Sequence, residues 1–184
     1  MREDDAVVAA AKHGDQDAWR TLYRAHAGRL VVWLGTRAGT DSAVAAEDVA
    51  AQTWLTAAEK VADYEGGADE FGAWLFGIAR RIAANSRRRS GRRRTDPVAE
   101  APPGSEVAGP DTSIPDQAWI RDLLAGLSPR ERDVVACVDV VGLSTADTAR
   151  ALGMTQVAVR VARHRALRRL RAEARTATLA ATIA

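Results

Sequence analysis

Apolar side chains recur at intervals of three and four residues through most of the first 90 positions of the chain. One such stripe follows Asp15 and consists of Trp19, Leu22, Tyr23, His26, Leu30, Trp33 and Leu34. This spacing places the stripe on one face of an α-helix. The Asp15 carboxylate can accept hydrogen bonds from the free backbone N–H groups of the first turn, so the helix is expected to begin there. Residues 39–41 (GTD) are expected to end it.

The same pattern predicts three more helices in this half. A short helix precedes Gly14, a third runs from about Ser42 to Val61, and a fourth opens at Asp69. Acidic residues at the start of the fourth helix suit its positive N-terminal dipole. The segment between the last two helices, residues 62–68, carries paired glycines and reads as a loop.

The helical pattern returns at Trp119. Ser128 is followed by Pro129 and Glu131, a combination typical of a helix start with a capping box. After Gly142 a short helix is predicted from Ser144, then a tight turn at residues 153–155, then a basic helix from residue 156 to about residue 174. A short helix, a glycine-containing turn and an arginine-rich helix indicate a helix-turn-helix, and a plain helical hairpin is the alternative.

Residues 95–115 differ from both halves. They hold five of the six prolines, together with glycine, serine and acidic residues, and they have no apolar face. We therefore expect an all-α fold of two small helical domains, residues 1–94 and 116–175, joined by a flexible acidic linker, residues 95–115, and followed by a C-terminal tail, residues 176–184.

The formal net charge of +2 hides a strong separation of sign along the chain. Residues 80–94 contain eight arginines and no acid, and residues 150–184 contain eight arginines and one acid. Acidic segments lie before and between these stretches. Two solvated helix faces are the simplest alternative, but such faces usually mix both signs, so the pattern favours contact with a polyanion at two places.

No set of residues indicates catalysis, a metal site or a cofactor. The three histidines are far apart, the single cysteine excludes an intramolecular disulfide, and no glycine-rich phosphate loop precedes a helix. His26 and Cys137 lie among apolar residues and are expected to be packed. The acidic N-terminus is unlike a signal peptide and no run is long enough for a membrane span, so the expected compartment is the cytoplasm.

The ordered set of motifs resembles a bacterial sigma factor of the extracytoplasmic-function (ECF) group. The first half carries residues 18–23 (AWRTLY), 46–49 (AEDV) and 71–80 (FGAWLFGIAR), and the second carries residues 127–134 (LSPRERDV) and 149–154 (ARALGM). Each is similar to a family segment at the expected spacing. The resemblance covers nearly the whole chain and implies a non-enzymatic protein that binds core RNA polymerase and promoter DNA, with an anti-sigma factor as a possible further partner.

The sequence departs from the family pattern at five positions: Ala51, Gln52, Arg81, Asn85 and Arg163. The family usually has a core leucine where Arg163 stands. The basic helix is therefore either rotated, with Ala162 and Ala166 inward, or it extends the head of Arg163 to water.

The resemblance assigns roles to exposed residues of the first domain. The polymerase-binding surface would lie on the third helix, with Glu47, Asp48 and Gln52 as candidates. The minus-ten element would be read as a single strand by the loop at residues 62–68 and the helix after it. The candidates there are Tyr64, Glu65, Arg80, Arg81, Arg87 and Arg88.

In the second domain the basic helix would read the minus-thirty-five element as a duplex. The candidates for base contacts are Thr155, Gln156, Arg160 and Arg163, because the first turns of a recognition helix reach base edges. Arg168 lies further along the helix and is a candidate for phosphate contact. Two rival functions remain open from sequence: a free-standing helix-turn-helix regulator that acts without polymerase, and an arginine-rich RNA-binding adaptor. Tight duplex binding without polymerase would distinguish the first rival, and the absence of promoter-dependent transcription would distinguish the second.

Overall fold

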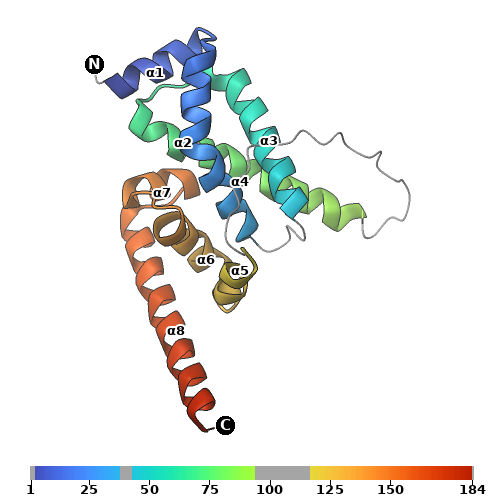
Figure 1. The fold of residues 1–184 in the computed structure, drawn as a ribbon, viewed down its shortest axis with the longest axis vertical. Coiled ribbons are helices and arrows are strands. Elements are labelled where there is room, and N and C mark those ends of the chain that lie inside the picture. Colours follow the sequence, from blue (N-terminus) through green and yellow to red (C-terminus); the bar gives the residue numbers. More distant parts are fainter. Residues whose placement is uncertain (1–2, 38–42, 94–116, 184) are drawn as a thin grey trace.

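The computed structural model describes residues 3–37, 43–93 and 117–183, and within these ranges the chain is helical with no strand (Figure 1). The first half contains α1 (Glu3–Lys12), α2 (Gln16–Gly35), α3 (Ala43–Lys60), the 3-10 turn η1 (Val61–Asp63) and α4 (Ala68–Arg93). The second half contains α5 (Gln117–Ala125), α6 (Pro129–Val135), the π-helical turn η2 (Ala136–Val140), α7 (Thr145–Leu152) and α8 (Gln156–Ile183). The all-α prediction is confirmed.

The predicted helix starts are present. Asp15 caps α2 and accepts a hydrogen bond from the backbone N–H of Ala18 at 2.7 Å. Ser128 and Glu131 form the predicted capping box at the start of α6, and Ser144 caps α7. These signals are local in sequence, so they could be read without knowledge of the fold.

Helices α1 to α4 form one packed group. Its centre contains Trp33 of α2 against Phe76 of α4, with ring centroids 5.4 Å apart, and both side chains are fully buried. A second aromatic cluster joins Tyr64, Phe71 and Trp74. Phe71 is fully buried.

Helices α5 to α8 form a second group in which α8 packs against α6 and α7. Its core includes Val134, Cys137, Val159 and Ala166, all fully buried. After α6 the chain continues as the π-helical turn η2, which ends at Val140, and Gly142 follows it with φ of 76°.

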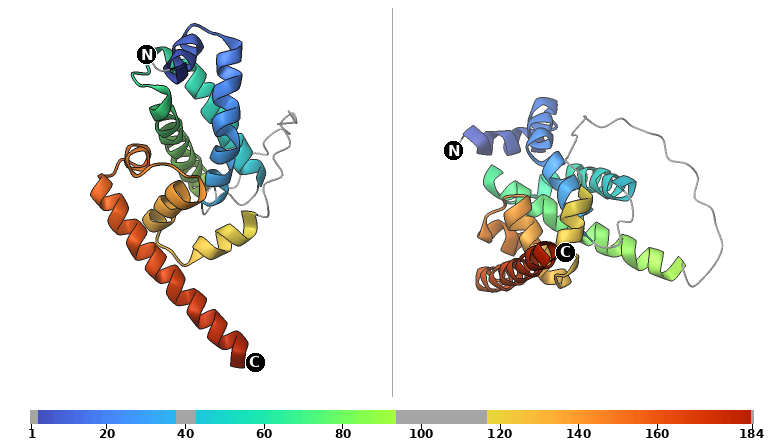
Figure 2. Two further views of the ribbon diagram at one scale, coloured as in Figure 1. Left: turned by 60° about the vertical axis from the view of Figure 1, so that its left-hand side comes forward. Right: turned by 60° about the horizontal axis from the view of Figure 1, so that its bottom comes forward.

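The two groups pack against each other, which the sequence did not predict. Helix α7 packs against α4 (Figure 2), and α2 contacts η2 and α5. The buried residues of both groups form one continuous core. The second group is therefore seated on the first in this structure.

Helix α8 also runs further than predicted. It continues to Ile183, whereas the sequence analysis placed its end near residue 174, and its last part extends away from the rest of the molecule (Figure 1). The residues after 174 are mainly alanine and threonine, and alanine is the strongest helix former. The predicted linker, residues 95–115, lies outside the described residues. Among the helices that are described, none combines the length and apolarity of a membrane span.

Candidate nucleic-acid and protein interfaces

A cavity of about 390 Å³ lies at the N-terminal end of α4, which is within the size range of ligand clefts. It brings together three of the predicted minus-ten residues, Tyr64, Glu65 and Arg81. The rest of its lining consists of Asp63, Glu70, Ala73, Trp74, Gly77, Ile78 and Arg150. The loop and helix that the resemblance assigned to one function therefore share one concave surface.

The Tyr64 ring forms part of this wall without being open to solvent. It is 6% exposed, packs 4.8 Å from Trp74 between ring centroids, and its hydroxyl donates to the Gly67 carbonyl at 2.8 Å. Burial, together with the nearby Glu70 carboxylate, raises the pKa of Tyr64 to about 12. A base stacked on the face of this ring would require the loop to move, whereas Trp74 is partly buried and lines the same cavity.

One residue of this cavity belongs to the other helical group. Arg150 of α7 forms an ion pair with Glu70 of α4, and it also lies 3.3 Å from the Asp147 carboxylate. Its hydrogen bond lowers the pKa of Glu70. Sequence reasoning missed Arg150 because no local signal shows that α7 packs beside the first domain.

Of the four arginines predicted on α4, only Arg81 lines the cavity, and its side chain is exposed. Arg87 and Arg88 are exposed further along the helix. Arg80 is partly buried, and a Cβ added to Gly153 would lie 3.4 Å from its Nη2 atom, so Arg80 reaches the turn between α7 and α8. The structure thus brings Arg81 to the cavity but directs Arg80 to the junction of the groups.

The helix-turn-helix geometry is formed by α7, the turn at Gly153 and α8. Gly153 has φ of 63°, and its backbone N–H caps the end of α7. In the turn before α8, the Thr155 hydroxyl accepts from the backbone N–H of Ala158 at 3.2 Å. Gln156, Arg160 and Arg168 are exposed on α8. Gln156, Arg160 and Arg168 therefore lie open on one helix, and Thr155 caps its start.

Arg163 is held by the protein itself. Its Nε atom donates to both carboxylate oxygens of Asp139 in η2, at 3.1 and 3.0 Å, and this carboxylate raises the pKa of Arg163. Ala162 and Ala166 are buried at 8% and 0% exposure. The helix is therefore rotated with both alanines inward, which was one of the two arrangements left open, and Arg163 braces α8 against η2.

The outer face of α3 carries the predicted polymerase-binding residues. Glu47, Asp48 and Gln52 are all exposed, while Ala46, Val49 and Thr53 are buried on the other side. The same face carries Leu55, whose 61% exposure is the largest among the exposed large apolar residues of the described chain. Leu55 was not predicted, although its position three residues after Gln52 is a signal that sequence could have supplied.

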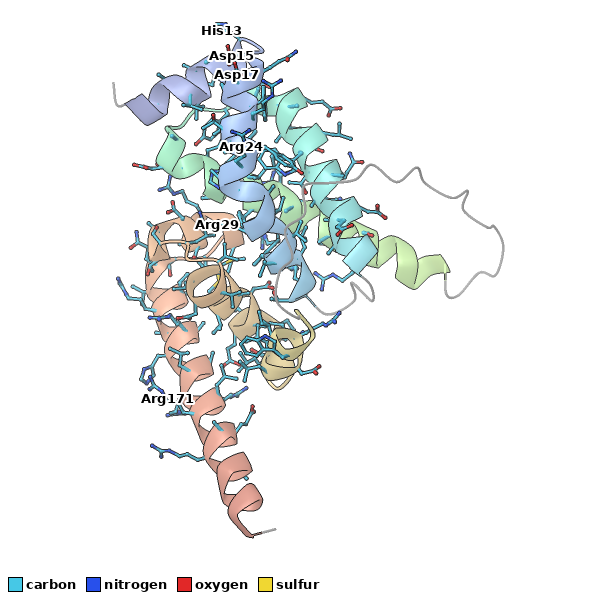
Figure 3. The ribbon with its side chains drawn as sticks, in the orientation of Figure 1. His13, Asp15, Asp17, Arg24, Arg29 and Arg171 are labelled. Atoms are coloured by element: carbon cyan, nitrogen blue, oxygen red, sulfur yellow. The ribbon has the colours of Figure 1, made fainter. Side chains whose placement is uncertain are left out.

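The junction between the groups contains a buried ion pair and a long-range hydrogen bond. Arg37 Nη1 lies 3.1 Å from Asp133 Oδ1, and Arg29 Nε donates to the Val141 carbonyl at 2.9 Å. Figure 3 shows Arg29 where α2 comes close to the second group. Burial lowers the pKa of Arg37 and raises that of Asp133, and the attraction between the two opposes both shifts.

Cys137 and His26 are both packed against other parts of the protein. Burial raises the pKa of the Cys137 thiol to about 12, so it is not ionised near neutral pH. Burial, followed by the charge of Arg29, lowers the pKa of His26 to about 4. Within the described ranges, no three His, Cys, Asp or Glu residues are grouped so that they could hold a metal ion.

Comparison with known families gives two matches in the order of the two helical groups. The family model of sigma-70 region 2 matches residues 22–93, and that of sigma-70 region 4 matches residues 117–170. The first match covers the α3 face and the cavity lining except Arg150, and the second covers most of the helix-turn-helix group.

Known proteins resemble the chain over most of its length. It is 37% identical over 175 residues to the ECF RNA polymerase sigma factor SigD of Mycobacterium tuberculosis, covering 92% of this chain and 82% of SigD. It is 33% identical over 191 residues to the ECF RNA polymerase sigma factor ShbA of Streptomyces griseus, covering 94% and 98%.

Two solved structures share the fold. CnrH in complex with the cytosolic domain of CnrY has a TM-score of 0.66 at 24% identity, covering 94% of this chain and 97% of CnrH. RpoE in complex with the anti-sigma factor NepR, from Bartonella quintana, has a TM-score of 0.60 at 23% identity, covering 86% and 94%. With both family regions present in order and curated relatives matched over most of their length, the chain belongs to the ECF sigma factors of the sigma-70 family, the subunits that bind core RNA polymerase and direct it to promoters.

Proposed function

We propose that this ECF sigma factor divides its work among three surfaces: the outer face of α3 binds core polymerase, the cavity at the start of α4 holds the single-stranded minus-ten element, and α8 reads the duplex minus-thirty-five element. The observation that carries this proposal is the helix-turn-helix of α7, Gly153 and α8, which leaves Gln156 and Arg160 exposed directly after the turn. The chain would act without catalytic groups of its own, and in the cytoplasm, where polymerase and chromosome are found.

The α3 face suits a protein partner because it combines charge with an exposed aliphatic side chain. Asp48, Gln52 and Leu55 follow one another at steps of four and three residues and so share one side of the helix. An apolar residue within a polar rim is the composition expected at the centre of a protein–protein contact. We include Leu55 with Glu47, Asp48 and Gln52 in this polymerase-binding surface.

The cavity suits a flipped nucleotide because aromatic, apolar and charged side chains converge in it. Trp74 offers partly buried aromatic surface, Glu65 an acceptor for base amino groups, and Arg81 and Arg150 charge for a phosphate. Since Arg150 comes from α7, its ion pair with Glu70 must rearrange if α7 leaves α4 when the two promoter elements are bound together.

Run-off transcription with purified core polymerase tests the proposal. The chain is expected to direct specific initiation from genomic promoter fragments, and the variant Asp48→Arg/Gln52→Arg is expected to lose co-purification with core polymerase while retaining its helix content. Gln16→Arg/Asp17→Arg is the matched control, because it makes the same charge change by replacing one exposed glutamine and one exposed aspartate of α2. Equal core binding by the double variant and the control would reject the α3 assignment.

A gel shift separates this function from a free-standing regulator. Tight promoter binding by the chain alone, unchanged by core polymerase, would favour the regulator. Promoter binding that depends on core polymerase would favour the sigma factor.

An anti-sigma factor is a second proposed partner. Its support is the likeness in fold to RpoE, which was solved bound to the anti-sigma factor NepR. Repression of run-off transcription by a co-expressed protein that co-purifies with the chain would identify it.

A further inference from the structure

Two valines on α8 are exposed although the helix has a well-formed buried side. Val157 and Val161 are 60% and 44% exposed, whereas Val159 between them is fully buried. The two exposed valines are four positions apart, so they form a small apolar patch on one side of the helix. Neither side chain belongs to the buried core of this structure.

The patch lies at the centre of the outward face. At about 100° per residue, Val157 points about 180° away from Ala166, which is fully buried. By the same arithmetic, Val161 lies about 40° from Val157 and Arg160 about 60° from it on the other side. Among the residues in the first turn of α8, Val157 therefore points most directly away from the buried side of the helix.

The chemistry of the major groove identifies the feature that such a residue can contact. Valine has no hydrogen-bonding group in its side chain. Among the base-pair edges in the major groove, the C5 methyl group of thymine is the apolar feature, and aliphatic side chains contact it. The neighbouring Gln156 and Arg160 supply the hydrogen-bonding groups that read purines.

We propose that Val157, assisted by Val161, reads thymine in the upstream promoter element through its C5 methyl group. The inference rests on the proposed function, because it requires α8 to be the recognition helix. The two valines are separated by about 6 Å along the helix axis, about two base-pair steps, so together they can contact thymines two base pairs apart.

Replacing thymine by deoxyuridine tests this contact because it removes the methyl group and keeps base pairing. The full chain is assembled with core polymerase on a promoter it transcribes, and each thymine of the upstream element is replaced in turn. At one or two positions, deoxyuridine is expected to weaken wild-type promoter binding about fourfold, the equivalent of about 0.8 kcal/mol for one buried methyl group.

Protein variants connect that loss to the valines. Val157→Ala is expected to bind the thymine promoter about fourfold more weakly than wild type and to show no further loss with deoxyuridine at the sensitive position. Arg160→Ala is the matched control on the same helix, and it is expected to keep the full deoxyuridine penalty. Thermal melting of each variant checks folding. Val157→Ala should melt at the wild-type temperature, because the Val157 side chain is exposed.

Several outcomes would overturn the inference: an upstream element without thymine, a wild-type protein indifferent to deoxyuridine, or a Val157→Ala variant that keeps the full penalty. Loss of polymerase or anti-sigma binding in Val157→Ala, without any deoxyuridine effect, would assign the patch to a protein partner instead. Transcription that ignores the upstream element altogether would reject the role of α8 itself, so the two failures are distinguishable.

Discussion

Arg37 at the end of α2 and Asp133 on α6 form an ion pair across the junction of the two helical groups. Their charged atoms are 3.1 Å apart, and the side chains are 7% and 22% exposed. The Arg37 guanidinium also lies 4.5 Å from the ring centroid of Trp33. The attachment of the second group to the first therefore depends on a pair that solvent screens only weakly.

Removing one partner of this pair is expected to be costly. Asp133→Ala should lower the free energy of unfolding by about 3 kcal/mol, because it leaves the Arg37 charge buried without its carboxylate partner. Urea denaturation followed by circular dichroism measures the loss.

The double variant Arg37→Leu/Asp133→Leu provides the comparison. It should lose less stability than Asp133→Ala, because no buried charge remains. If the effects of Arg37→Leu and Asp133→Leu, measured singly, add up to that of the double variant, the pair does not couple the groups.

The lowered pKa of His26 predicts that the free energy of unfolding depends on pH. Its pKa is lowered from 6.5 to about 4 in the folded protein, so between these values the unfolded chain binds more protons and stability falls as the pH falls. The contribution of His26 to the free energy of unfolding is fully present above pH 6.5 and is lost as the pH falls toward 4. The expected loss is about 2 kcal/mol, discounted for the partial exposure of the ring.

Denaturation at several pH values between 4 and 7 tests this, with His26→Gln as the variant that cannot titrate. The variant should lose this part of the pH dependence. Parallel stability curves for the two proteins would show that His26 does not make the proposed contribution.

Replacing two glycines by alanine is expected to change the stability of the protein in opposite directions. Gly153→Ala should destabilise the protein by about 1 kcal/mol, because φ of 63° is unfavourable for any residue with a Cβ. Gly77→Ala should stabilise by about 0.5–1 kcal/mol, because the glycine is inside α4 and its added Cβ would lie 3.9 Å from the nearest backbone atom, an ordinary contact. Thermal melting of both variants measures the difference, and changes of the same sign would contradict this account.

The sequence predicted the features that depend on near neighbours along the chain. Asp15, Ser128 and Ser144 could be identified as caps because each cap and the backbone group that it binds are a few residues apart. The inward stripes of α2 and α4 could be read for the same reason, since helical periodicity is a local property.

Features that join distant segments could not be predicted in this way. The ion pair of Arg150 with Glu70 links residues 80 positions apart, and the bond of Arg29 to Val141 links residues 112 apart. The role of Arg163 required knowledge of the π-turn that presents Asp139 to it. Each depends on packing between elements, which composition and periodicity do not specify.

The structure sharpens the distinction among the arginines of α8. Arg163 is engaged with Asp139, whereas Arg160 and Arg168 are exposed. Arg160 lies in the second turn of α8, where a recognition helix reaches base edges, and Arg168 lies about two turns further on. Arg160 is therefore expected to affect sequence choice, and Arg168 mainly general affinity.

Alanine replacements of Arg160 and Arg168 test this expectation in transcription from single-base variants of the upstream element at several salt concentrations. Arg160→Ala should cost about 1–3 kcal/mol and relax the preference at one base pair, because a bidentate contact with guanine is lost. Arg168→Ala should weaken all promoters similarly and reduce the salt dependence by about one unit, because one phosphate contact is lost. If Arg160→Ala lowers every promoter variant by the same factor, Arg160 binds the backbone, and base reading must be assigned to other residues of the outward face.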